Sequence, residues 1–165
     1  MKILLVIDQF NDSNNGTTIS ARRFAEGLEK NGHKVEILST GNANNSYKLK
    51  EVALPPGISH IIKSQGMTFA MPNSKVFDKA LKDVDIVHFY MPFLMSRAAL
   101  KKVEELNIPR TAAFHVQPEN ITYTIGLGTN KKINDGIYSF YRNNFYNRFN
   151  HIHCPSNFIA NQLKN

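Results

Sequence analysis

The residues best suited to chemistry in this sequence are its histidines, because an imidazole can donate, accept or carry a proton near neutral pH. His115 stands in the segment AAFHVQPEN (112–120), where an apolar run reaches a histidine and then turns polar. This pattern is compatible with a core histidine, a metal ligand, or a reactive group at the end of a strand. Gln117 and Pro118 indicate that the strand ends here, which favours the last of these roles.

The other histidines fit structural roles better. His88 lies inside the apolar run VDIVHFYM (84–91), and we interpret it as a core or near-core histidine. His151 and His153 alternate with Ile152, so they share one face of a short strand, next to the single cysteine, Cys154. Nothing nearby supplies a clear third or fourth ligand, and we therefore expect no metal site.

The chain that positions these side chains alternates strands with helices. Strands are expected at 2–8, 34–40, 84–91, 110–116 and 151–155, each an apolar run with β-branched or aromatic residues. Five helices are expected. The first begins after the cap Thr17 or Thr18 and ends at Gly32, and the second covers 74–83 with Ser74 as its cap. The others cover about 94–107, 131–149 and the residues after the cap Ser156. Residues 41–73 indicate loops with one or two short strands.

This alternation predicts an α/β fold: a Rossmann-like, doubly wound, mainly parallel sheet with helices on both faces. The length of 165 residues is typical of one domain, which we assign to residues 1–165. Ligands of such sheets bind at the carboxyl ends of the strands. His115, as the sixth residue of its expected strand, would lie on that rim and could hydrogen-bond a substrate hydroxyl, with Glu119 contacting the same ligand or capping a turn.

The loop after the first strand leads into a helix N-terminus, which attracts anions through its free N–H groups and its dipole. Gly16 would allow a ligand to approach the backbone closely, although an ordinary loop fits equally well. A dinucleotide-binding fingerprint needs three spaced glycines and an acidic residue after the second strand, but that strand ends in Ser39 and Thr40. No G-x-x-x-x-G-K-[ST] phosphate loop occurs either, so both of these nucleotide motifs are disfavoured.

Composition narrows the class of protein. The net charge is +7, and residues 97–165 contribute most of it, with nine Lys and Arg against four Asp and Glu. Such a surface is either simply solvated or suited to an anionic partner, but no RNA- or DNA-binding motif accompanies it, and we expect no nucleic acid. The apolar start is too short for a signal or a membrane span, and one cysteine fits a reducing compartment, so we expect a cytoplasmic protein.

Four segments, taken in order, resemble the N-terminal half of glycosyltransferase family 4, whose members have the GT-B fold. They are MKILLVID with NNGTTISARRFAEGLEKNGHKVEILST, DIVHFYMPF, PRTAAFHVQPE, and HIHCPSNFIANQLKN. The resemblance covers essentially the whole chain. It implies a retaining transferase that moves a sugar from a nucleotide-sugar donor to a lipid or glycan acceptor, without a cofactor or catalytic metal.

The same resemblance implies roles for individual residues. His115 would be catalytic and contact the transferred sugar, and Asn15, Gly16 and Thr17 would lie against the donor diphosphate. Pro92, Phe93, Gln117 and Glu119 would border the acceptor cleft. This chain departs from the family pattern in three ways: Asn15 replaces the first glycine of a Gly-Gly pair, Tyr90 replaces the second histidine of an H-x-H strand end, and the E-x7-E donor domain is absent. We therefore expect residues 1–165 to be inactive alone.

Two questions stay open from the sequence. The basic, aromatic helix over 131–149 could meet an anionic membrane, which would place the protein peripherally at the inner face of the plasma membrane. We favour the alternative, in which the helix packs Ile133, Ile137, Tyr141 and Phe145 on the core and its basic residues lie in solvent. A stand-alone nucleotide- or flavin-binding module and a non-catalytic scaffold with this fold are the alternatives to a transferase half.

Overall fold

The computed structural model describes residues 1–10, 16–41, 44–64, 66–115, 117–124 and 130–164. In these residues six strands form one sheet in the order β3-β2-β1-β4-β5-β6, and every neighbouring pair is parallel. The strands are β1 (Lys2–Gln9), β2 (Lys34–Thr40), β3 (Ser46–Leu49), β4 (Ile86–Phe89), β5 (Arg110–Ala113) and β6 (Ile152–His153). The predicted α/β, doubly wound class is thereby confirmed.

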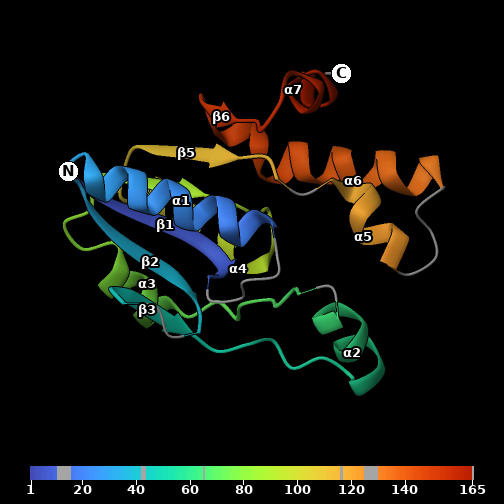
Figure 1. Ribbon diagram of the computed structural model, residues 1–165, viewed down its shortest axis with the longest axis horizontal. Coiled ribbons are helices and arrows are strands. Elements are labelled where there is room, and N and C mark those ends of the chain that lie inside the picture. Colours follow the sequence, from blue (N-terminus) through green and yellow to red (C-terminus); the bar gives the residue numbers. More distant parts are fainter. Residues whose placement is uncertain (11–15, 42–43, 65, 116, 125–129, 165) are drawn as a thin grey trace.

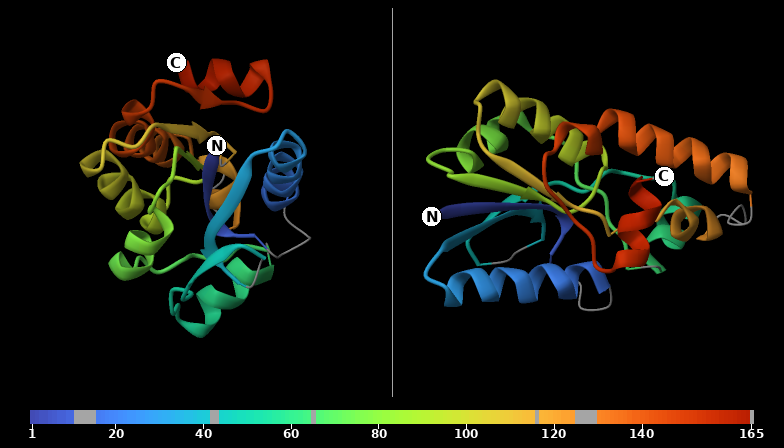
Figure 2. Two further views of the ribbon diagram at one scale, coloured as in Figure 1. Left: turned by 90° about the vertical axis from the view of Figure 1, so that its left-hand side faces the viewer. Right: turned by 90° about the horizontal axis from the view of Figure 1, so that it is seen from above.

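Helices cover both faces of the sheet (Figures 1 and 2). One face carries α1 (Gly16–Lys30), and the other carries α3 (Ser74–Ala80), α4 (Leu94–Glu105) and α6 (Lys131–Asn144). The remaining helices are α2 (Pro56–Ser64), α5 (Pro118–Thr124), the short 3-10 helix η1 (Tyr146–Arg148) and α7 (Asn157–Lys164). Figure 1 shows α2 standing away from the sheet, and no residue of α2 is buried.

The core consists of two apolar clusters, one on each face of the sheet. Leu4 and Val6 of β1 belong to the cluster under α3 and α4, whereas Leu5 and Ile7 belong to the cluster under α1. Successive side chains of a strand point to opposite faces, so a strand buried on both sides must be apolar throughout. This requirement explains why KILLVI reads as a continuous apolar run.

The caps and stops predicted for the helices are confirmed in part. Gly32, with φ of +81°, ends the turn after α1, and the Ile159 N–H donates to Ser156 Oγ at 3.3 Å as the predicted cap of α7. The cap of α3 is Asn73, whose Oδ1 accepts from the Val76 N–H, so the prediction of Ser74 was wrong by one residue. Both Thr17 and Thr18 lie within α1, so neither precedes it as a cap.

Several element bounds also differ from the prediction. Residues 41–73 contain β3 as expected but also α2, and α5 follows β5 where we expected only a loop. Both helices contain or follow proline, which is tolerated in a first turn. The expected helix over 131–149 ends at Asn144, and η1 continues it in 3-10 form. Strands 84–91 and 110–116 are each shorter, so His115 lies two residues beyond the end of β5.

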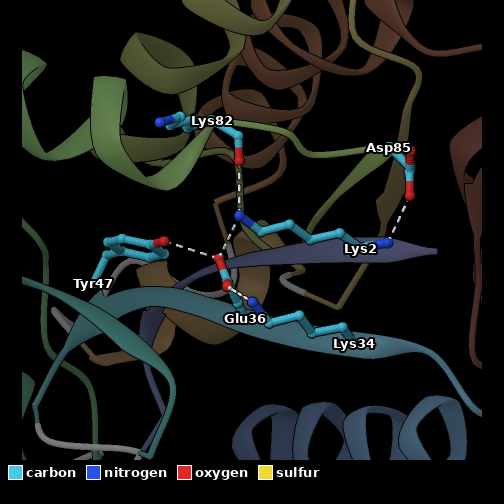
Figure 3. A network of polar contacts seen from close by, with 6 residues as sticks. All are labelled: Lys2, Lys34, Glu36, Tyr47, Lys82 and Asp85. Atoms are coloured by element: carbon cyan, nitrogen blue, oxygen red, sulfur yellow. Dashed lines mark hydrogen bonds and ion pairs between the residues drawn. The ribbon is translucent and has the colours of Figure 1, made fainter.

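A polar network fixes the amino edge of the sheet, opposite the rim that carries the predicted site (Figure 3). Glu36 of β2 accepts from Tyr47 of β3 at 2.9 Å and forms ion pairs with Lys2 at 3.1 Å and Lys34 at 2.9 Å. The Lys2 ammonium also donates to the Lys82 carbonyl. A buried carboxylate needs such partners to offset its lost hydration. The network therefore joins β1, β2, β3 and the turn before β4.

Candidate functional site

The predicted site residues lie along the carboxyl edge of the sheet. The strand order reverses between β1 and β4, and ligands of doubly wound sheets bind outside the strand ends at such a switch point. Pro92 and Phe93 follow β4, His115 and Gln117 follow β5, and Figure 1 shows α1 beginning at this same edge. The fold thus brings segments that are up to about a hundred residues apart to one rim.

The start of α1 supplies the candidate anion site. Gly16 is exposed and opens the helix, Thr17 is half-buried, and Thr18 is buried with its hydroxyl donating to the Gln9 carbonyl at 3.5 Å. No acidic side chain occupies the first turn, so the helix dipole there is not neutralised by one. A Cβ at Gly16 would meet nothing within 4 Å, so internal packing does not require glycine. Asn15, the third predicted residue, lies outside the described residues.

His115 is half-buried at the rim, and its Nε2 is a buried atom with no hydrogen-bond partner among the described residues. Its ring stacks on Tyr90, with centroids 5.7 Å apart and planes 18° apart, and approaches His153 at 5.9 Å. Burial lowers the pKa of His115, and the neighbouring His153 acts in the same direction. The imidazole is therefore neutral near pH 7 and can exchange hydrogen bonds with a hydroxyl.

His88 behaves as the core histidine that the sequence predicted. It is 7% exposed, and its Nδ1 lies 2.7 Å from the hydroxyl of Thr111 on β5. Burial, with smaller contributions from His153 and His115, lowers the pKa of His88 to about 4. The interpretation of His88 as a satisfied, uncharged core residue is confirmed.

Phe93 lies in an aromatic group at the rim. Its ring meets Phe69 edge-on at a centroid distance of 4.9 Å and Tyr141 of α6 at 6.5 Å. Such edge-to-face contacts contribute about 0.5–1.5 kcal/mol each beyond burial. Pro92 is itself buried, so it supports this wall of the rim rather than lining an open surface.

Gln117 and Glu119 meet a residue that sequence reasoning missed, Tyr138 of α6. The Tyr138 hydroxyl donates to Glu119 Oε2 at 3.0 Å, and Gln117 also hydrogen-bonds this hydroxyl. Burial and the bond to Glu119 raise the pKa of Tyr138. Glu119 lines a cavity of about 530 Å³ together with residues of α6 and α7: Lys131, Asp135, Tyr138, Ser139, Arg142 and Leu163. The register of α6 against α5 decides these contacts, and no sequence signal revealed it.

A second residue missed by sequence reasoning is Asp8, at the end of β1. It is 1% exposed, its Oδ1 accepts from the Ala70 N–H at 2.9 Å, and its Oδ2 has no partner among the described residues. Burial raises the pKa of Asp8 to about 7, against the opposing effect of the bond from Ala70. In the sequence, the signal that could have revealed Asp8 is the position of a charged residue at the end of an apolar strand.

The histidines near the rim are not accompanied by a metal-binding arrangement in the part of the chain that the structure describes. Among the residues that the structure describes, no group of three or more His, Cys, Asp or Glu side chains is arranged to hold a metal ion. His151 and His153 are both exposed at the edge strand β6, and Cys154 is half-buried. Within the same described ranges, every helix is too short or too polar to cross a bilayer.

The chain is similar to several known glycosyltransferases. The chain is 25% identical over 169 residues to an alpha-monoglucosyldiacylglycerol synthase of Streptococcus pneumoniae, covering 99% of this chain and 37% of that protein. An alpha-glucosyltransferase solved with UDP and DNA containing an HMU base aligns with 93% of this chain and 37% of its own, at 17% identity and a TM-score of 0.44. The glycotransferase of kitacinnamycin aligns with 89% of this chain and 40% of its own, at 11% identity and a TM-score of 0.33.

The family comparison extends over nearly the whole chain. The profile named Glycosyltransferase Family 4 matches residues 14–165, which include α1, all strands after β1 and every residue of the site that the sequence predicted. The chain spans little more than a third of the length of the curated relative it matches. With this match, and with a sheet that carries the resembling segments at one rim, the chain belongs to Glycosyltransferase Family 4.

Proposed function

We propose that this chain is the N-terminal, acceptor-side half of a retaining glycosyltransferase that moves a sugar from a nucleotide-sugar donor to a lipid or glycan acceptor. A second half, which holds most of the donor, completes the active cleft. The family match and the partial coverage of the lipid glucosyltransferase relative support this assignment. The observation that carries it is the neutral, half-buried His115, whose buried Nε2 lacks a partner among the described residues at the ligand-binding rim.

The proposed reaction joins an acceptor hydroxyl oxygen to the anomeric carbon while the bond from that carbon to the donor diphosphate breaks. The nucleoside diphosphate leaves with the electron pair, and the hydroxyl proton passes to the leaving group or to water. The backbone N–H groups at Gly16 and Thr17 would face the growing negative charge of the diphosphate. His115 would hydrogen-bond a hydroxyl of the transferred sugar, and no catalytic metal takes part.

The acceptor would approach from the side of β4 and α5. The half-buried Phe93, backed by Pro92, offers an apolar wall, while Gln117 and Glu119 offer polar groups that already engage Tyr138. An amphiphilic acceptor with a hydroxylated head and an apolar body would fit this combination. We extend to this chain the lipid class of acceptor named for the pneumococcal relative, with a glycan as the second possibility.

The test is His115→Ala in the complete natural polypeptide that contains residues 1–165. We expect sugar transfer to fall by roughly a hundredfold, since the imidazole would act where charge develops. His33→Ala is the matched control, because His33 lies at the opposite edge of the sheet, directly before β2. Activity of His115→Ala equal to that of the control would reject the role. Residues 1–165 alone should give no turnover, and measurable transfer by this fragment would contradict the two-half arrangement.

We further propose that the protein contacts an anionic membrane peripherally, at the inner face of the plasma membrane. Lys131 and Lys132 are exposed at the start of α6, and the exposed ring of Phe140 lies under the guanidinium of Arg97 at 4.8 Å. Ile133, which we expected could pack on the core, is 36% exposed, whereas Phe145 is fully buried. Basic and apolar groups side by side suit an anionic lipid surface.

Sedimentation with vesicles of phosphatidylglycerol and phosphatidylcholine tests this contact at low salt. We expect the wild-type chain to bind and the double charge reversal Lys131→Glu with Lys132→Glu to bind severalfold more weakly. The control reverses two other exposed lysines, Lys79→Glu with Lys101→Glu, on α3 and α4. Equal losses in both double variants would mean a general charge effect, and absence of wild-type binding would remove the membrane proposal.

A further inference from the structure

Four rings form a row across one face of the sheet near its carboxyl edge: His88, Tyr90, His115 and His153. His88 and Tyr90 are two residues apart along β4 and its end, so both side chains point to the face that α1 covers. Ala113 on that face pairs with His153 of β6, and His115 follows Ala113 by two residues. Alternation along three neighbouring strands thus aligns the four rings.

Within this row, Tyr90 is the ring best able to hold another ring in place. It is 2% exposed and packs in the same buried cluster as Ile7, Met91 and Ala113. His88 meets it edge-on, with a centroid distance of 4.9 Å and an interplanar angle of 82°. A side chain this deeply buried is held in its rotamer by close packing. Tyr90 is therefore a fixed surface at the rim.

His115 lies on that fixed surface. The 5.7 Å centroid distance and 18° interplanar angle describe an offset stack, which is a favourable arrangement for two flat rings. The imidazole of a reactive histidine is commonly oriented by a hydrogen bond to one nitrogen. The Nε2 of His115 has no such partner in the described part of the chain, so this nitrogen does not orient the ring, whereas the stack on Tyr90 can. His153, at 5.9 Å and 53°, borders the ring further along the row.

We propose that Tyr90 is a positioning residue for His115: its ring holds the imidazole at the angle from which it reaches the transferred sugar. This inference rests on the proposed function, because it assigns Tyr90 an effect on transfer only through His115. The phenol hydroxyl has no part in it, so the ring alone should suffice. Tyr90→Phe should then behave as wild type, whereas Tyr90→Leu should remove the ring on which the His115 imidazole stacks.

The stacking itself is tested in the 165-residue chain by NMR of the histidine ring protons. The His115 signals are identified as those that disappear in His115→Ala. A ring stacked on an aromatic face feels its ring current, so these signals should keep their positions in Tyr90→Phe and shift clearly in Tyr90→Leu. Unchanged His115 signals in Tyr90→Leu would overturn the proposal. Tyr90→Met is prepared in parallel, because a flexible side chain of similar length fills the same space if leucine impairs folding.

The effect on transfer is measured in the complete natural polypeptide with wild type, Tyr90→Phe, Tyr90→Leu, His115→Ala and the double variant Tyr90→Leu with His115→Ala. We expect Tyr90→Leu to lower kcat roughly tenfold to a hundredfold with little change in KM, as small misplacements of a reacting group do. Tyr90→Phe should stay within about threefold of wild type, and the loss should vanish in the His115→Ala background, since residues that act as a unit are not additive.

The outcomes separate this inference from the proposed function. If His115→Ala transfers sugar like wild type, the proposed function fails. If His115→Ala is impaired but Tyr90→Leu transfers sugar like wild type, His115 keeps its role and the positioning by Tyr90 is wrong. The same conclusion follows if Tyr90→Leu lowers the transfer rate as much in the His115→Ala background as it does alone. A parallel loss in Tyr90→Phe would also overturn it, because the hydroxyl would then be essential.

Discussion

Asp8 Oδ1 accepts a 2.9 Å hydrogen bond from the Ala70 N–H, which joins the end of β1 to a segment 62 residues further along the chain. The amide of the adjacent Gln9 donates to the Gly66 carbonyl in the same segment. This segment carries Phe69, whose ring meets Phe93 at the rim. The end of the central strand therefore fixes a wall of the proposed acceptor side by way of a buried carboxyl group.

Asp8 should make stability depend on pH. The pKa of Asp8 rises from 3.8 to about 7 on folding, so the folded chain holds more protons between about pH 4 and pH 7. Its contribution to stability is complete below about pH 4 and is lost as the pH rises towards 7, by at most about 1.4 kcal/mol per pH unit. Urea denaturation of Asp8→Asn should show a smaller fall over this window than wild type. The exposed Asp83→Asn should retain the wild-type slope, and equal slopes in all three proteins would contradict the prediction.

Glu36 should have the opposite pH dependence. Burial acts to raise its pKa, but hydrogen bonds from Lys34, Lys2 and Tyr47 outweigh burial and lower it (Figure 3). The stabilisation is thus present above the pKa that Glu36 has in the unfolded chain, and it is lost as the pH falls through the lower pKa that Glu36 has in the folded chain. Glu36→Gln should lower the free energy of unfolding by about 1–3 kcal/mol at pH 7, with the difference shrinking on acidification. The exposed Glu29→Gln is the control, and a pH-independent difference for Glu36→Gln would count against the charge network.

Glu104 should stabilise the packing of α4 against β5 and η1. Its carboxylate accepts from Arg110 at 3.0 Å and from Arg148 Nε at 2.8 Å, and Arg110 Nε also donates to the Arg148 carbonyl at 3.1 Å. Because these groups are partly exposed, we expect Glu104→Gln to cost only about 1 kcal/mol of unfolding free energy in urea. The neighbouring exposed Glu105→Gln should cost less than half of that, and equal effects would show that this network contributes nothing specific.

Gly16 offers a separation of stability from function. A Cβ at Gly16 or at Gly27, both in α1, meets nothing within 4 Å, so neither alanine substitution should destabilise the fold, and each should stabilise it by about 0.4–1 kcal/mol. If the donor diphosphate approaches the backbone at Gly16, Gly16→Ala should lower transfer by the complete polypeptide at least severalfold while Gly27→Ala leaves it unchanged. Thermal unfolding and initial rates measure the two effects, and full activity of Gly16→Ala would exclude a close approach there.

Local patterns predicted the architecture well where one element has one dominant signal. The continuous apolar run over residues 2–8 predicted β1, and the glycine stop at Gly32 predicted the end of α1, because burial on both faces of a strand and a positive φ each leave a direct trace in the sequence. Those patterns failed for α2 and for the break after Asn144. In α2 nothing is buried, so no apolar face forms against the sheet, and at Asn144 the aromatic spacing continues from α6 through η1.

The sequence by itself determined the fold class, the family and the position of His115 near the end of a strand, because each depends on order and spacing along the chain. Only the tertiary structure decided that Tyr90 stacks on His115, that Glu119 meets Tyr138, and that Asp8 is buried against Ala70. These contacts join residues from different strands and helices. Their geometry depends on strand register and helix packing, which many distant side chains determine together and no short segment encodes.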